Sequence, residues 1–162
     1  ADCARKKGLP VVMDAGSVRE GSEELVSLCT DVISSSIFAP QLTGLNEPLV
    51  ALKELRRRGP QRVAMTFGSA GVLALGDPSF VVPAFKVEVL DTTGAGDVFH
   101  AGYAYSLANG GEFEHNLRFG SALAALKCSH WSGRGGLPLL KDVLEMMELG
   151  EKLPVSLPID LS

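Results

Sequence analysis

The chain has 162 residues, 46% of them hydrophobic, which suffices for one domain with a sizeable core. A net charge of −4 argues against general binding to nucleic acid or to a membrane surface, so neither is an expected partner. Cys3, Cys29 and Cys128 are widely spaced without a CxxC pair, which indicates reduced thiols rather than disulfides or a zinc site. Because no apolar run is long enough to cross a bilayer either, we expect a cytoplasmic protein.

The first residues predict the end of a helix followed directly by a strand. Residues 1–8 are typical of the last turns of a helix with Gly8 as its stop, and Val11–Met13 is a short apolar strand. The chain opens without Met, in the middle of what resembles a helix–strand unit. We therefore expect it to be the C-terminal part of a longer protein.

Helices and strands then alternate. One helix is expected over Glu20–Cys29, and another begins at an N-cap on Asn46, with Pro48 just inside it, and runs to Arg58. Apolar strands follow each of these helices, over Asp31–Ser35 and Arg62–Thr66. This alternation predicts an α/β fold with a doubly wound, mostly parallel sheet and flanking helices. Ligands of such sheets bind beyond the carboxyl ends of the strands.

A glycine-containing turn follows the strand that ends at Thr66. Gly68 and Gly71 allow a tight turn, which either leads into the next strand or approaches a ligand closely. Two further strands, Val72–Leu75 and Ser79–Phe85, are expected to form a hairpin around residues 76–78.

Three more helices complete the pattern. They are expected over Ala95–Leu107, Glu114–Cys128 and Leu139–Glu148. The second contains Gly120 among other small residues, which permits close approach of a neighbouring helix or of a flat ring; helix packing is the commoner cause. Residues 151–162, with Pro154 and Pro158, are expected to be an extended tail.

The most informative stretch is DTTGAGD, residues 91–97, at the start of the helix expected from Ala95. Glycines at a helix mouth let backbone N–H groups converge on an anion that the helix dipole already favours. Asp97 falls in the first turn, beside that anion pocket. A carboxylate there would repel a phosphate unless the chemistry needs a base, and phosphoryl transfer to a hydroxyl needs one.

A simpler interpretation is that Asp91 and Thr92 only cap a buried helix. Two glycines, two hydroxyls and two carboxylates within seven residues favour a functional site instead. The longer string DTTGAGDVFHAG, residues 91–102, resembles the second signature of the ribokinase (PfkB) family of carbohydrate kinases. Residues 1–150 would then be the C-terminal portion of a ribokinase-like nucleotide-binding domain, with the N-terminal part and the β-sheet lid outside this sequence.

The resemblance implies roles for individual residues. Asp97 is expected to be the catalytic base, and the anion hole would comprise Gly94, Ala95 and Gly96 together with the Asp97 N–H. The match of residues 66–71 to the family's TxGxxG loop adds ATP contacts, which are expected at Thr66, Gly68, Ser69 and Gly71. Residues 118–138 resemble the family's closing region, which runs past adenine, and this resemblance adds Ser121 near the nucleotide. A monovalent cation such as K⁺ would lie between Asp91 and Thr93 and the backbone carbonyls of Lys127, His130, Ser132 and Gly136.

The sequence departs from the family pattern at two places. Many members carry Asn-x-x-Glu near Mg²⁺ and the phosphates, where this chain has Ser35 and Phe38. Phe38 cannot act on a hard cation, so Mg²⁺ is either held chiefly by ATP and water or the protein is weakened or inactive. His100 stands where ribokinases usually have Asn, and we assign it no catalytic role. The strings GDVFHAG, AALKC and GRGGLP resemble the branch of sugar kinases near sulfofructose kinase and ketohexokinase.

Three functions follow from this resemblance. The first is ATP-dependent phosphorylation of a primary hydroxyl of a small sugar or sugar derivative, with ATP and Mg²⁺ as cofactors. The second is a nucleotide-binding or regulatory homologue without turnover, and the third is the same fold acting on a nucleoside or a sugar phosphate. Residues that select the acceptor usually belong to the N-terminal half, as does the lid through which many members form homodimers.

Overall fold

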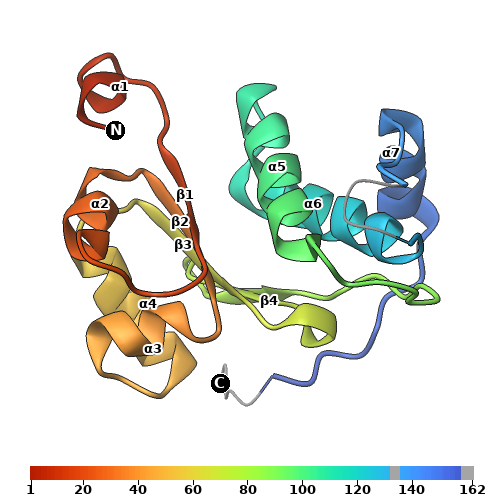
Figure 1. Ribbon diagram of the computed structural model, residues 1–162, viewed down its shortest axis with the longest axis horizontal. Coiled ribbons are helices and arrows are strands. Elements are labelled where there is room, and N and C mark those ends of the chain that lie inside the picture. Colours follow the sequence, from red (N-terminus) through yellow and green to blue (C-terminus); the bar gives the residue numbers. More distant parts are fainter. Residues whose placement is uncertain (132–135, 158–162) are drawn as a thin grey trace. The chain divides into compact units, whose positions relative to one another are not determined.

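The computed structural model describes residues 1–131 and 136–157, which form two compact units (Figure 1). The first unit contains residues 1–67 and 72–81 together with Leu157. The second contains residues 68–71 and the described residues from Val82 to Ser156. Within the described residues, no helix has both the length and the apolar character needed to cross a membrane.

A five-stranded sheet forms the centre of the first unit, and its strand order β1-β2-β3-β4-β5 follows the chain. The strands β1 (Val12–Ala15), β2 (Asp31–Ser35) and β3 (Arg62–Thr66) pair in parallel. β4 (Val72–Ala74) runs antiparallel to β3, and β5 (Phe80–Val82) is its other neighbour, as the expected hairpin requires. The predicted α/β class is confirmed, and the sheet is mixed.

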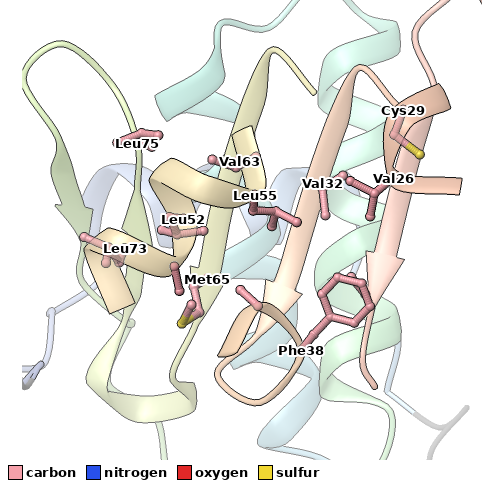
Figure 2. Packing of buried hydrophobic residues seen from close by; sticks show 13 residues of the cluster. Val26, Cys29, Val32, Phe38, Leu52, Leu55, Val63, Met65, Leu73 and Leu75 are labelled. Atoms are coloured by element: carbon pink, nitrogen blue, oxygen red, sulfur yellow. The ribbon is translucent and has the colours of Figure 1, made fainter. Parts of the chain in front are cut away.

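Helices α2 (Ser22–Leu28), α3 (Phe38–Thr43) and α4 (Pro48–Arg57) pack on this sheet, whereas the short α1 (Asp2–Lys6) precedes β1. Figure 2 shows the resulting core, in which apolar side chains from the helices meet those of the strands. Leu52 and Leu55 of α4 are fully buried in the same cluster as Val63 and Met65 of β3. Apolar burial of this kind contributes about 1.5–3 kcal/mol for each large side chain.

The N-cap of α4 is Glu47, so the prediction of Asn46 was wrong. The Glu47 carboxylate accepts hydrogen bonds from the backbone N–H groups of Leu49 and Val50, at 3.1 and 2.6 Å. Pro48 occupies the first helical position, and a proline keeps the residue before it extended, which is the backbone conformation of an N-cap. The proline therefore places the cap one residue later than composition alone suggested.

Helix α3 was not expected from the sequence, and it explains part of the departure at Ser35 and Phe38. The Ser35 hydroxyl accepts from the backbone N–H groups of Ile37 and Phe38, both at 3.2 Å, and donates to Gly16 O at 2.6 Å. Phe38 is 0% exposed and belongs to the core of the unit. This position therefore contributes to packing, and its side chain has no contact with solvent.

The second unit is built on three helices, α5 (Ala95–Ala108), α6 (Phe113–Cys128) and α7 (Leu140–Leu149). α5 and α6 approach closely at two glycines. A Cβ on Gly102 would come 3.0 Å from Gly120 Cα, and a Cβ on Gly120 would come 2.7 Å from Phe99 O. Helix packing thus accounts for the glycine at position 120 of α6.

The segment after α7 is paired with the strand-like residues 84–86. Phe85 and Lys152 form an antiparallel bridge, and Lys86 N–H donates to Glu151 O at 2.8 Å. Leu153 N–H donates in turn to Ala84 O at 2.8 Å. The expected tail is therefore anchored at residues 151–153 and has no regular structure over residues 154–157; residues 158–162 lie outside the described part.

A buried carboxylate links β2 and β3. Asp31 is 0% exposed and faces the Arg62 guanidinium, with Oδ1 2.6 Å from Nε and Oδ2 3.0 Å from Nη2. The Thr30 hydroxyl also donates to Asp31 Oδ2, at 2.6 Å. The charge of Asp31 is thereby compensated where water cannot reach it.

We expect Gly120→Ala to destabilise the protein by about 1–2 kcal/mol, because overpacking against Phe99 O exceeds the gain in helix propensity from alanine. The midpoint of urea unfolding measures this. Gly16→Ala is the control, since a Cβ there meets nothing within 4 Å, and it should change stability by less than about 0.5 kcal/mol. Equal midpoints for the two variants would contradict the packing described here.

Arg62→Leu should lower the free energy of unfolding by about 3 kcal/mol, because it leaves the Asp31 carboxylate buried without its cation. Arg57→Leu is the matched control, since Arg57 is 82% exposed and lies 3.4 Å from Glu54. Exposed pairs of that kind contribute less than about 1 kcal/mol. Denaturant unfolding of both variants measures the free energy of unfolding. A similar small decrease for each variant would show that the buried Asp31 charge does not need Arg62 for its compensation.

Candidate phosphate-binding site

The stretch at 91–97 forms a tight loop that opens α5. Asp91 Oδ1 accepts the backbone N–H of Thr93 at 2.8 Å, and Thr92 O accepts that of Ala95 at 3.1 Å. Gly94 is the N-cap, with φ +75° and ψ +9°, a left-handed conformation that residues with a Cβ rarely adopt. The glycine is thus what allows the loop to turn directly into the helix.

The mouth of α5 is open. Gly96 and Asp97 are exposed, and a Cβ built on Gly96 would meet nothing within 4 Å. N–H groups of a first helical turn have no acceptor within their own helix, and the helix dipole makes this end positive. An anion can therefore approach the amides of Gly96 and Asp97 without obstruction, and the Asp97 carboxylate is the acidic side chain of that turn.

The loop is held to the end of α6 by backbone and side-chain hydrogen bonds. Cys128 O accepts the N–H groups of Leu90 and Asp91, at 2.8 and 3.2 Å. The Lys127 ammonium, on a residue 0% exposed, donates to Asp91 O at 2.8 Å. The sequence predicted a role only for the carbonyl of Lys127, as a cation ligand. The apolar run ALAALKC that contains this lysine was the signal that could have indicated a buried side chain.

His100 lies one turn into α5. Its Nδ1 is 2.7 Å from Gly96 O, so Nδ1 carries the hydrogen and the carbonyl accepts. The ring also packs edge-on against Phe99, with centroids 5.7 Å apart. His100 therefore stabilises the first turn of α5 through its hydrogen bond to Gly96 O.

The predicted ATP loop contains a single turn of 3-10 helix, η1 (Gly68–Ala70), which Gly71 N–H closes by donating to Gly68 O at 3.1 Å. Gly68 and Gly71 both have positive φ, and a Cβ on Gly71 would come 2.6 Å from Val82 O. Gly68 and Ser69 are exposed, with open space around Gly68. These residues belong to the same unit as the loop at 91–97.

The remaining predicted ATP contacts are placed differently. Thr66 ends β3 in the first unit, and its hydroxyl donates to Ser34 O at 3.3 Å. Ser121 is 7% exposed within α6, so its hydroxyl has little access to solvent. Contact of either residue with ATP stays a prediction.

The expected ligands of a monovalent cation are partly brought together. Gly136 packs so closely on His130 that a Cβ would overlap its ring, whereas Ser132 lies outside the described residues. Asp91 O accepts the Lys127 ammonium, and Lys127 O accepts His130 N–H at 3.1 Å. Within the described ranges, no group of three or more His, Cys, Asp or Glu side chains is arranged to hold a metal ion.

An open cavity of about 710 Å³ lies in the first unit, between α4 and the turn at 75–79. Lys53, Arg56 and Arg57 line it together with Asp77. Arg56 and Arg57 lie in the last turn of α4, where they complement the negative end of the helix dipole, whereas Lys53 lies in the middle of the helix. We assign Arg56 and Arg57 that electrostatic role.

The fold and this loop define a class of protein: an α/β protein with a glycine-containing helix mouth that is open to solvent and an exposed carboxylate in its first turn. The family model described as pfkB family carbohydrate kinase matches residues 1–139. Ribokinase of Bacillus subtilis (strain 168) is 31% identical over 144 residues, which cover 86% of this chain and 46% of the relative. The chain belongs to the PfkB family of carbohydrate kinases.

Solved structures agree. A putative ribokinase from Agrobacterium tumefaciens is 33% identical with a TM-score of 0.83, covering 91% of this chain and 50% of its own. Arabidopsis thaliana ribokinase, in complex with ribose and ATP, is 28% identical with a TM-score of 0.78, covering 89% and 49%. The chain thus spans about half the length of the relatives it matches.

Burial raises the pKa of the Cys128 thiol, with the nearby Lys127 lowering it and Asp91 raising it, and burial also raises the pKa of Cys29. A raised pKa reduces the thiolate fraction at a given pH. In the native protein at about pH 8, iodoacetamide should therefore modify the exposed Cys3 well before the other two, whose labelling should accelerate as pH rises.

Mass spectrometry of timed samples measures this order. In concentrated urea, where burial is lost, the three thiols should react at similar rates. Labelling of native Cys128 as fast as Cys3 would contradict the packed end of α6.

Proposed function

We propose that this protein catalyses ATP-dependent phosphorylation of a primary hydroxyl on a small sugar or sugar derivative. The observation that carries the proposal is the exposed Asp97 in the first turn of α5, beside amides that an anion can reach. Membership of a carbohydrate-kinase family supports the reaction class, and the relative from Arabidopsis thaliana binds ribose and ATP.

Asp97 would accept the proton of the attacking hydroxyl. Its position at the third residue of α5 sets it beside the pocket where the transferring phosphoryl group would lie. A positioned base of this kind contributes roughly 10²–10⁴-fold in rate. The backbone amides at Gly94, Gly96 and Asp97 would stabilise negative charge that develops on the phosphoryl oxygens, and fixed donors of this type are worth several kcal/mol. Ala95, the fourth residue of the proposed anion hole, would join them by exchanging its hydrogen bond to Thr92 O for one to the phosphoryl group.

ATP would contact the exposed turn at Gly68 and Ser69, with Gly71, Thr66 and Ser121 as further contacts. Mg²⁺ would enter with ATP and be held chiefly by phosphate oxygens and water, because the Phe38 side chain is buried in the core and has no oxygen to offer. Its chemistry is to neutralise phosphate charge. Asp91 and Thr93 offer oxygen atoms of the kind that K⁺ prefers.

The acceptor is the least constrained part of the proposal. A nucleoside or a sugar phosphate would use the same base and the same amides.

A cytoplasmic location and dimer formation through a lid are expectations that rest on the family. A nucleotide-binding homologue without turnover is favoured by one observation, the buried Phe38 at the position of a family carboxylate.

In the protein at its full length, Asp97→Asn should lower turnover by roughly 10²–10⁴-fold, because the amide cannot accept the hydroxyl proton. ATP affinity should stay within about threefold, since the loop that binds phosphate is unchanged. Sugar-dependent ADP release over a panel of pentoses, hexoses and their derivatives measures turnover, and calorimetric titration with ATP measures affinity.

Glu114→Gln is the matched control, because Glu114 is also an exposed acid in the first turn of a helix of the same unit. It should retain wild-type turnover. Wild-type turnover by Asp97→Asn would refute the base assignment. Saturable ATP binding without ADP release on any acceptor would favour the homologue without turnover.

A further inference from the structure

The most unusual side chain in the second unit is the lysine at the end of α6. Lys127 is 0% exposed, and it is among the largest fully buried side chains of the described chain. Taking an ammonium out of water costs several kcal/mol unless it gains polar partners. The Lys127 ammonium donates to the main-chain carbonyl of Asp91, at 2.8 Å.

That carbonyl lies at the start of the loop before α5. Asp91 begins the loop that opens α5, three residues before the left-handed Gly94. Two further hydrogen bonds reach the same place from the same helix end, because Cys128 O accepts the N–H groups of Leu90 and Asp91. The peptide units on either side of Asp91 are thus fixed from α6, one through its N–H and the other through its carbonyl.

The surroundings of the ammonium favour a cation. Lys127 lies in the last turn of α6, where carbonyl groups point out of the helix and the dipole is negative. Hydrogen bonds from a charged donor are about twice as strong as neutral ones. The bond to Asp91 O is therefore a strong restraint on a loop whose Thr92, Thr93 and Gly96 are exposed.

We propose that Lys127 is a positioning residue for phosphoryl transfer: its buried ammonium holds the Asp91 carbonyl and so fixes the loop that presents the amides and Asp97 at the mouth of α5. This inference rests on the proposed function. Lys127 would touch neither substrate nor cofactor, and its effect would reach the reaction through the geometry of residues 91–97.

A purely structural role for Lys127 makes different predictions. If the lysine only filled space in the helix pair, a methionine of similar length would replace it without consequence, and such replacements of buried charges are often neutral or stabilising. If instead the ammonium restrains the loop, Lys127→Met should fold normally and yet loosen residues 90–97. The variant therefore separates the two roles.

Hydrogen–deuterium exchange tests the restraint without reference to activity. In Lys127→Met at full length, peptides covering residues 90–97 should exchange at least about tenfold faster than in the wild type. Peptides covering α7 and the first-unit sheet should be unchanged, and the urea midpoint should be close to the wild-type value. Lys141→Met, at an exposed lysine of α7, is the matched control and should match the wild type throughout.

The kinetic arm uses the same variants. Because small displacements of reacting groups cost up to about 10²-fold, Lys127→Met should lower kcat by roughly 10- to 100-fold while KM for ATP changes by less than about threefold. Lys127→Arg keeps a cation and donors, so it should exchange more slowly than Lys127→Met over residues 90–97 and recover part of kcat.

Unchanged exchange over residues 90–97 in Lys127→Met would overturn the proposal, as would faster exchange spread evenly over the unit, or Arg and Met variants that behave alike. If the wild type releases no ADP with any acceptor, the proposed function fails, and the exchange experiment still decides whether Lys127 restrains the loop.

Discussion

The geometry at the mouth of α5 depends on how the preceding loop is fixed to the end of α6. Cys128 O accepts two N–H groups from residues 90 and 91, and the Lys127 ammonium donates to the carbonyl of Asp91. In the phosphoryl transfer that we propose, the first-turn amides of α5 and the Asp97 carboxylate would be effective only if they keep a fixed direction. The hydrogen bond from the charged, fully buried Lys127 to Asp91 O restrains the loop in one orientation.

Close packing of α5 and α6 has the same consequence on a larger scale. Gly102 and Gly120 allow the two backbones to approach, and Phe99 O lies where a side chain on Gly120 would otherwise be. Because the loop at 91–94 is attached to one helix and continues into the other, the two helices and the loop act together. Gly120 is therefore part of how the mouth of α5 is positioned, although it has no side-chain chemistry of its own.

Much of this arrangement could be predicted from the sequence. The strands Asp31–Ser35 and Arg62–Thr66 have the bounds that apolar patterning indicated, and α5 begins at Ala95 as the glycine-rich loop implied. The misses have physical causes. Pro48 moved the cap of α4 to Glu47, and α3 forms because Phe38 finds a place in the core, which local patterning cannot reveal. The side chain of Lys127 was overlooked because a lysine is ordinarily expected to be exposed, and only the packed helices show that it is not.

The backbone pairing between residues 84–86 and 151–153 has a practical consequence. Lys86 and Leu153 donate across it, and Lys86 also lies 3.0 Å from the Glu151 carboxylate. The chain after α7 therefore supplies an edge to a segment almost seventy residues earlier in the sequence, roughly the separation of Phe85 and Lys152. A shortened version for crystallisation should keep at least Leu153, and an affinity tag is better joined beyond that residue than directly to α7.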